Sequence, residues 1–196
     1  YQIEAIESSL IGFQNADRGQ LIMACGTGKT VTTFWLKERI EADLTLFLVP
    51  CLSLITQAIK EWQNASNSVI NFLCVCSDYT VVEKQEYDDA NLDNKHPVTS
   101  SVSEIESFME QNNTRVIFAT YQSLELVMQA QHNVKVAIDL GIFDEAHKCA
   151  GNKDRLFSLG LDAEKLFIKK RLFVTATPRI YKTNTHNKEF EESIVS

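Results

Sequence analysis

The sequence has few of the residues that interrupt helices and strands, and it has no long apolar run. Its 196 residues include three prolines and seven glycines, which is too few for a collagen-like or linker-dominated chain. No apolar run approaches the roughly eighteen residues of a membrane-spanning helix, and no basic-then-apolar leader is visible. We therefore expect a globular domain with no membrane span. The chain begins at Tyr1 rather than at Met, which suggests a piece of a longer protein.

The cysteines and the charge balance also exclude simple assignments. The five cysteines are odd in number, and no two pairs of them have the spacing of metal ligands. Cys74 and Cys76 would share one face of a strand within an apolar run, which favours buried reduced thiols over a zinc site. Reduced thiols indicate a cytoplasmic protein. The formal net charge of −7 does not by itself indicate nucleic-acid binding. A few cationic side chains and backbone amides can still form a phosphate-binding face.

Short apolar runs alternate with amphipathic stretches along most of the chain. Runs typical of buried strands separated by helices indicate an α/β fold, with a mostly parallel sheet covered by helices on both faces. Ligands of such sheets bind at the carboxyl ends of the strands. The acidic stretch 77–100 is interpreted as a surface excursion, and a capping box (Ser101 with Glu104, or Ser103 with Glu106) is expected to begin a helix. Strands are predicted at 20–25, 44–50, 71–78, 115–121, 136–147 and 171–178, and helices at 28–42, 52–65 and 101–112.

The stretch "MACGTGKT" (23–30) has the features of a phosphate-binding loop. Gly26 and Gly28 allow backbone amides to point into one concavity, and the helix that follows offers its N-terminus to an anion. Lys29 supplies a cation for the β and γ phosphates of a nucleotide, and the hydroxyl of Thr30 can bind Mg²⁺. The pattern departs from the usual one at its first glycine position, which here is Met23. A glycine-rich turn between a strand and a helix is the structural alternative.

Two acids follow a later apolar strand in "GIFDEAHK" (141–148). Asp144 can reach the Mg²⁺ of a bound nucleotide, and Glu145 suits the general base that activates the attacking water. Acids at a helix N-terminus are the structural alternative. That alternative does not explain why they end a buried strand in a chain that also has a phosphate loop, so the pair favours ATP hydrolysis.

Taken together, these motifs resemble those of superfamily 2 helicases and translocases. The letters at 144–147 spell a DEAH box, and this superfamily often lacks the first loop glycine. Other stretches match family motifs in the family's order: Gln2, "LVPCLSLITQ" (48–57), "ATYQSL" (119–124) and "VTATPR" (174–179). The residues within these motifs are most similar to those in the motors of type I, type III and single-polypeptide restriction enzymes and in related predicted helicases. The resemblance implies a RecA-like domain that acts on nucleic acid, usually double-stranded DNA, with ATP and Mg²⁺.

The resemblance also assigns roles to individual residues. Lys29, Asp144 and Glu145 would be catalytic, Thr30 and Asp144 would hold Mg²⁺, and Gln2 would read adenine. The set expected to bind ATP is Gln2, Cys25, Gly26, Thr27, Gly28, Lys29 and Thr30. His147, Thr175, Ala176 and Thr177 would relay between the ATP and nucleic-acid sites. Nucleic-acid contacts are expected at Pro50, Ser53, Thr120, Tyr121, Gln122 and Ser123.

The family's motor has two RecA-like domains, and the second carries the arginine finger. We expect residues 1–179 to form the first domain and the polar stretch 180–196 to lead towards the second. The parent protein could also carry nuclease or methyltransferase domains. The alternatives are a RecA-like platform that binds ATP or DNA without hydrolysis and, less favoured, a small-molecule kinase. Trp35 and Trp62 are expected to pack in the core.

Overall fold

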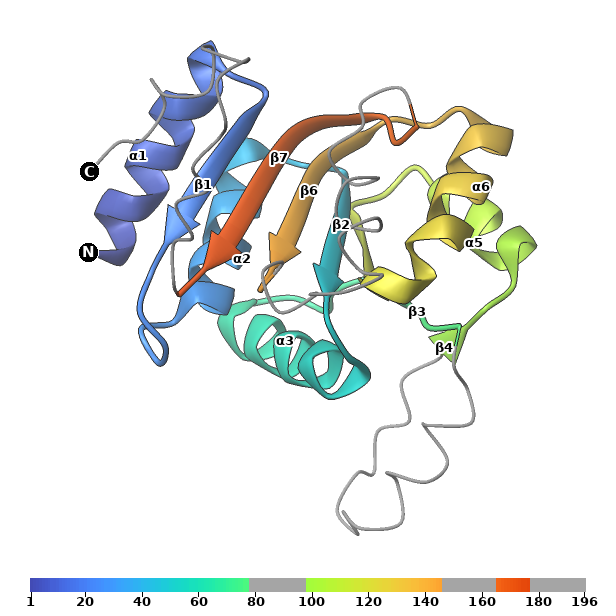
Figure 1. The fold of residues 1–196 in the computed structure, drawn as a ribbon, viewed down its shortest axis with the longest axis horizontal. Coiled ribbons are helices and arrows are strands. Elements are labelled where there is room, and N and C mark those ends of the chain that lie inside the picture. Colours follow the sequence, from blue (N-terminus) through green and yellow to red (C-terminus); the bar gives the residue numbers. More distant parts are fainter. Residues whose placement is uncertain (78–97, 146–164, 177–196) are drawn as a thin grey trace, which may run out of the picture.

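A computed structural model describes residues 1–77, 98–145 and 165–176. Its centre is a sheet of seven parallel strands in the order β1-β7-β6-β2-β5-β3-β4 (Figure 1). The strands are β1 Arg18–Ile22, β2 Leu44–Val49, β3 Phe72–Val75, β4 Val98–Thr99, β5 Arg115–Thr120, β6 Ile138–Asp144 and β7 Ile168–Thr175. The helices are α1 Gln2–Asn15, α2 Lys29–Ile40, α3 Leu52–Ala65, α5 Val102–Met109 and α6 Leu124–Val134, with a 3-10 turn at Tyr121–Ser123. The predicted α/β class is confirmed.

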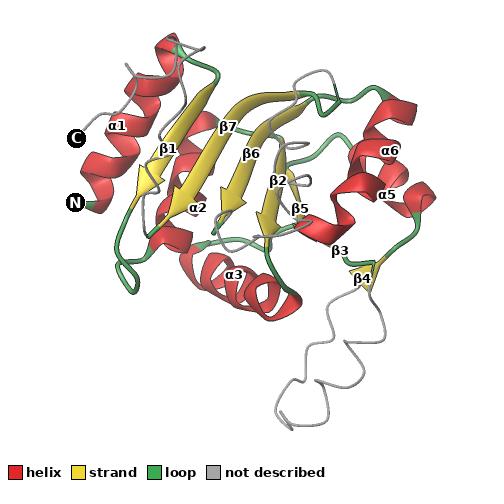
Figure 2. Cartoon of the chain, viewed as in Figure 1, coloured by secondary structure: helices red, strands yellow, loops and turns green. Residues whose placement is uncertain are grey.

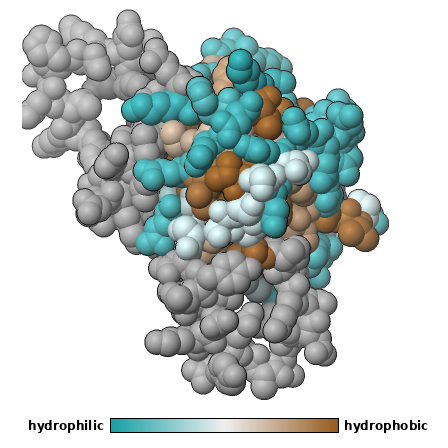
Figure 3. Space-filling model, turned by 90° about the vertical axis from the view of Figure 1, so that its right-hand side faces the viewer, coloured by the Kyte–Doolittle hydropathy of each residue, from teal (hydrophilic) through white to brown (hydrophobic). Residues whose placement is uncertain are grey.

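Helices cover both faces of the sheet because each central strand is apolar on both sides. On β2, Phe47 and Val49 belong to a core that also contains residues of α1, α2 and α3. The alternate residues Leu46 and Leu48 belong to a second core with α5 and α6, as the side-chain period of a strand requires. Figure 2 shows α5 and α6 together at the β3–β4 end of the sheet and α1 beside β1. Over that α5–α6 end, apolar residues show only in small areas between hydrophilic ones (Figure 3).

Aromatic side chains fill the core between α2, α3 and the sheet. The ring of Trp62 is fully buried and lies edge-on to Phe34, Phe47 and Phe118 at centroid separations of 5.5, 5.4 and 5.4 Å. Such edge-to-face pairs stabilise beyond the burial of area alone. The prediction that Trp62 packs in the core is confirmed. The same prediction for Trp35 is wrong, since that ring is 43% exposed on the outer side of α2.

Several local expectations differ from the structure. Two helices, α1 and α6, were not predicted, and β1 covers Arg18–Ile22 rather than 20–25. The expected capping box does not form: Ser101 caps α5 without a side-chain hydrogen bond to the helix, and its hydroxyl instead lies 2.9 Å from that of Ser103. The last residues of the supposed surface excursion pair with β3 as strand β4. The rest of that excursion lies outside the described residues.

The amino ends of the strands are held together by a half-buried carboxylate. Oxygen Oδ2 of Asp139 accepts hydrogen bonds from the backbone amides of Asp43 (3.1 Å) and Leu44 (2.9 Å), and Oδ1 accepts one from Lys169 Nζ (2.7 Å). Burial raises the pKa of this carboxyl, but the amide of Leu44 and the Lys169 ammonium outweigh it and the net pKa is lowered. Asp139 therefore joins β2, β6 and β7 as a carboxylate at neutral pH.

The two described cysteines of the apolar run are buried and free, as predicted. Burial, with a smaller contribution from Cys76, raises the pKa of the Cys74 thiol to about 12, so Cys74 is an inert core residue. No helix among the described ranges is long and apolar enough to cross a membrane.

Candidate nucleotide site

The loop between β1 and α2 has the backbone conformation that a phosphate-binding loop needs. Gly26 and Gly28 have φ angles of 77° and 80°, which glycine adopts without steric cost. Gly28 is the N-cap of α2, so the helix begins at Lys29 and presents its unpaired amides towards the loop. The loop follows the carboxyl end of β1, at the edge of a parallel sheet where ligands bind.

The structure explains why Met23 can replace the first glycine of the usual loop pattern. Its side chain is 7% exposed and belongs to the same core as Leu21 and Val174. Its amide donates a hydrogen bond to the carbonyl of Thr175 (3.1 Å), which continues the pairing of β1 with β7. Position 23 therefore still belongs to the packed sheet, and the turn that needs glycine begins after it. The amide-donating part of the loop, from Gly26 onwards, is intact.

The phosphate loop and the acidic motif meet at one place. The Nζ atom of Lys29 lies 3.9 Å from Oε1 of Glu145, with both side chains about nine-tenths buried, and 3.5 Å from the carbonyl of Ala24. Glu145 has a φ of 49°, an uncommon conformation for a residue with a side chain and one that is found at functional sites. A hydrogen bond from its amide to the carbonyl of Val174 (3.0 Å) holds it there.

The residues expected to hold Mg²⁺ lie at the same edge of the sheet. Asp144 is the last residue of β6, and Thr30 is in the first turn of α2. Only β7 separates β6 from β1, so the ends of those two strands are about 10 Å apart. Both side chains are half-buried. A hydroxyl and a carboxylate are the ligand types that Mg²⁺ takes from proteins, through one or two side chains together with phosphate oxygens and water.

Across the described residues there is no group of three or more His, Cys, Asp or Glu side chains that could hold a metal ion. The two residues expected to hold Mg²⁺, Thr30 and Asp144, would leave its other positions to phosphate oxygens and water.

The backbone carbonyl oxygens of the two residues expected to hold Mg²⁺ accept hydrogen bonds from buried aromatic side chains. The indole Nε1 of Trp62 donates to the carbonyl of Thr30 (2.9 Å), and the hydroxyl of Tyr121 donates to the carbonyl of Asp144 (3.1 Å). Sequence reasoning missed both contacts. The available signal was the need of a buried indole or phenol for a hydrogen-bond partner, but the sequence does not say which partner.

Gln2 lies against the phosphate loop itself. Its Nε2 donates to the carbonyl of Thr27 (2.9 Å) and is the atom nearest to the position that a Cβ on Gly28 would take. The hydroxyl of Thr27 bonds the carbonyl of Ala24 (2.7 Å), which closes the turn, and Cys25 is exposed. The predicted reading of adenine by Gln2 stays a prediction.

The residues expected to contact nucleic acid differ in exposure. Ser53 is exposed in the first turn of α3 and Pro50 is half-buried just before that helix, while Gln122 is exposed in the 3-10 turn. The other three are buried: Thr120 (3% exposed), Tyr121 (1%) and Ser123 (0%). The Ser123 hydroxyl lies 2.8 Å from that of Thr120 and accepts a hydrogen bond from the amide of Ser77 (2.8 Å). The nucleic-acid role of all six residues stays a prediction. The hydroxyls of Thr120 and Ser123 contribute to the conformation of the turn.

The motif expected to relay between the two sites is partly described. Thr175 ends β7, is 8% exposed and pairs with Ile22 of β1. Ala176 follows it in a bend. His147 and Thr177 lie outside the described residues. Thr175 therefore ends the strand that lies between β1 and β6, and its relay role stays a prediction.

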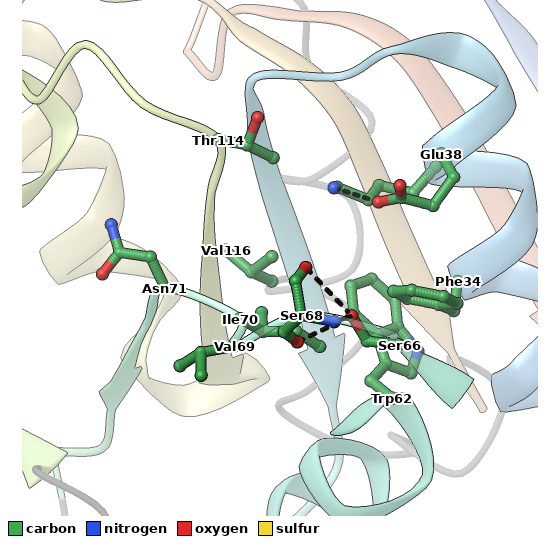
Figure 4. A pocket seen from close by; sticks show the side chains of 11 residues that line it. Phe34, Glu38, Trp62, Ser66, Ser68, Val69, Ile70, Asn71, Thr114 and Val116 are labelled. Atoms are coloured by element: carbon green, nitrogen blue, oxygen red, sulfur yellow. Dashed lines mark hydrogen bonds and ion pairs between the residues drawn. The ribbon is translucent and has the colours of Figure 1, made fainter. Parts of the chain in front are cut away.

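A hollow of about 170 Å³ opens at the opposite edge of the sheet. Figure 4 shows Phe34 and Trp62 on one side of it and Val69 and Asn71 on the other. It lies beside the amino ends of β3 and β5 and the carboxyl end of α2. None of the predicted site residues lines it, and ligands of parallel sheets bind at the other edge. We therefore place the nucleotide at the loop and not in this hollow.

A seven-stranded parallel sheet with a glycine loop and a carboxylate pair at one edge defines a RecA-like domain of superfamily 2 helicases. Comparison with known proteins supports this class. The chain belongs to the family described as the type III restriction enzyme res subunit, whose model matches residues 1–180.

Similar proteins are helicases and restriction enzymes. A probable helicase of African swine fever virus is 35% identical over 182 residues, which cover 91% of this chain and 19% of that protein. The Type ISP restriction-modification enzyme LlaGI, solved as a nuclease-deletion mutant with a DNA substrate mimic, is 32% identical with a TM-score of 0.73, covering 92% of this chain and 17% of that one. LlaBIII bound to DNA is 28% identical with a TM-score of 0.68, covering 99% and 14%. The chain thus spans less than a fifth of these relatives.

A helicase domain of lower identity shows the same fold. The Hef helicase domain of Pyrococcus furiosus is 17% identical with a TM-score of 0.56, covering 91% of this chain and 34% of that one. At that identity only the fold is comparable.

Proposed function

We propose that this chain is the ATP-binding and ATP-hydrolysing domain of a motor that moves on duplex DNA, within a protein like a restriction-modification enzyme or one encoded by a mobile element. The observation that carries the proposal is the meeting of Lys29 and Glu145 at 3.9 Å. It brings the cation of the phosphate loop and the base of the DEAH motif into one site.

Residues of this chain can be assigned to phosphate binding, metal binding and activation of water. The amides of Gly26 to Lys29 and the ammonium of Lys29 would bind the β and γ phosphates. Thr30 and Asp144 would hold Mg²⁺, which neutralises phosphate charge when bound. The Glu145 carboxylate would take a proton from water as the water oxygen bonds to the γ phosphorus and the bond to the β–γ bridging oxygen breaks.

Duplex DNA is supported by the relatives rather than by charge. LlaGI and LlaBIII are solved with a DNA substrate mimic and with DNA, and the chain itself has a formal charge of −7. We propose that Pro50, Ser53 and the turn at Gln122 touch the sugar-phosphate backbone, which positions a motor without reading sequence. The buried side chains of Thr120, Tyr121 and Ser123 would hold the conformation of that turn.

The parent protein is proposed to complete the motor. We propose that residues 1–179 form the first RecA-like domain and that 180–196 lead to a second one carrying an arginine finger, with nuclease or methyltransferase domains attached and the protein in the cytoplasm. A non-hydrolysing platform is the second candidate. The retention of Lys29, Thr30, Asp144 and Glu145 favours the motor over it.

The test is the ATPase rate of the full-length protein with duplex DNA, single-stranded DNA and RNA. Glu145→Gln should abolish hydrolysis while ATP still binds, and Glu7→Gln, on the exposed face of α1, is the matched control and should change nothing. Stimulation mainly by duplex DNA supports the proposal. Stimulation by single strands or RNA keeps the motor and rejects duplex DNA, and ATP binding without hydrolysis under every condition favours the platform.

A further inference from the structure

Two buried aromatic side chains reach from the segments proposed to touch nucleic acid to the residues proposed to hold Mg²⁺. Trp62 is on α3 and donates to the carbonyl of Thr30 (2.9 Å). Tyr121 is in the turn after β5 and donates to the carbonyl of Asp144 (3.1 Å). Each of the two metal-site residues therefore has its backbone held by one such side chain.

Both donors have little freedom to move away from their acceptors. Trp62 is 0% exposed and Tyr121 is 1% exposed, and the Trp62 ring packs edge-on against Phe34, Phe47 and Phe118. A buried donor that loses its acceptor costs more than an ordinary hydrogen bond is worth. The ring and the carbonyl that it holds are therefore constrained to move together.

The chain segments that carry these donors also carry the exposed candidate contacts. Ser53 and Trp62 are nine positions apart on one helix, α3, which is about 14 Å of rigid rise. Tyr121 directly precedes the exposed Gln122. A contact that shifts either segment displaces an aromatic ring directly, without any intervening loop.

We propose that Trp62 and Tyr121 are positioning residues that couple nucleic-acid binding to the Mg²⁺-holding residues Thr30 and Asp144. This inference rests on the proposed motor function. Nucleic acid on α3 and on the 120–123 turn sets the two rings, and the rings set the backbone from which the Thr30 hydroxyl and the Asp144 carboxylate project. Coupling of this kind is reciprocal, so Mg²⁺ and nucleotide favour the nucleic-acid-bound arrangement in return.

The test removes one donor and leaves its ring in place, in the full-length protein. Tyr121→Phe removes only the hydroxyl. At position 62, site-specific incorporation of 3-benzothienylalanine replaces the indole N–H by sulfur and keeps the bicyclic shape. The readouts are the ratio of ATPase rates with and without saturating duplex DNA, and the effect of that DNA on the affinity for a non-hydrolysable ATP analogue with Mg²⁺.

A matched control separates coupling from stability. Gln131 is 4% exposed, donates from Nε2 to the carbonyls of Val136 (3.0 Å) and Phe167 (2.8 Å), and accepts from the amide of Phe167 (2.9 Å). These bonds lie at the amino ends of β6 and β7, away from the nucleotide. Gln131→Met should lower the melting temperature and leave the DNA stimulation ratio unchanged.

We expect each single change at position 62 or 121 to reduce the stimulation ratio about fivefold, the factor that one hydrogen bond of coupling is worth. The effect of DNA on analogue affinity should shrink by a similar factor. Wild-type stimulation in both variants, with only a lower melting temperature, would overturn the coupling while the motor function stands. An equal loss of the ratio in Gln131→Met would overturn it too. A wild-type protein that no nucleic acid stimulates would remove the proposed function and this inference with it.

Discussion

Gly28→Ala offers a test of the phosphate loop that can be worked through from the structure. Gly28 has a φ of 80°, and a residue with a Cβ in the left-handed region costs about 1–2 kcal/mol. The added Cβ would also displace the Gln2 amide, which bonds the carbonyl of Thr27 (2.9 Å). Loss of that hydrogen bond costs about 1 kcal/mol. The free energy of unfolding should therefore fall by about 2–3 kcal/mol.

Gly26→Ala is the matched control for the same loop. Gly26 has nearly the same φ, 77°, but nothing lies within 4 Å of the position that its Cβ would take. Its cost should be the backbone strain alone, about 1–2 kcal/mol. The difference between the two variants then measures the Gln2 contact, and Gln2→Ala in the Gly28→Ala background should cost almost nothing further.

Urea unfolding of the 196-residue chain measures both variants, with the slope m used to check that the unfolded state is unchanged. Equal losses in Gly26→Ala and Gly28→Ala would refute the role of Gln2. Gln2→Ala could also lower the free energy of unfolding by its full amount in the Gly28→Ala background. That result would refute the role of Gln2 as well, because the effects of substitutions at residues in contact should not be additive. Nucleotide affinity, measured on the same variants, should fall in both, since both change the amides that face the phosphates.

Three further predictions concern the core, pH and activity. Met23→Gly restores the usual loop pattern but removes a buried side chain, so the free energy of unfolding should fall by about 2–5 kcal/mol in urea; an unchanged stability would show that Met23 is not a core residue. The lowered pKa of Asp139 contributes stability that is present above its unfolded pKa and lost as pH falls through the folded value. Asp139→Asn should therefore destabilise at pH 7, and its difference from wild type should begin to shrink as pH falls below about 4 and disappear below the folded pKa; parallel pH profiles would contradict this. The isolated chain should hydrolyse ATP slowly, because an arginine finger from a second domain is worth about 10³–10⁵ in rate; a turnover within about tenfold of a two-domain motor would refute that expectation.

Much of the fold was predictable because the short apolar runs are uninterrupted and the motifs lie at their ends. The runs at 44–50 and 115–121 became β2 and β5 almost residue for residue, since strands buried on both faces must be apolar throughout. The helices α1 and α6 were not predicted. Helix α1 buries only Ile6 and Phe13, and the polar residues between them obscure its period. The predicted capping box is not formed by Ser101, whose hydroxyl lies 2.9 Å from that of Ser103.

The sequence by itself determined the fold class, the position of the phosphate loop and the identity of the acids, because residue types at short spacing specify glycine conformations, charges and strand ends. Tertiary structure alone decided how these pieces meet. Lys29 and Glu145 are far apart in the chain and become neighbours only because β1, β7 and β6 pair in register. The contacts of Trp62 with Thr30 and of Tyr121 with Asp144 likewise depend on helix and strand packing. A buried donor must find an acceptor, but the packing of the core decides which one.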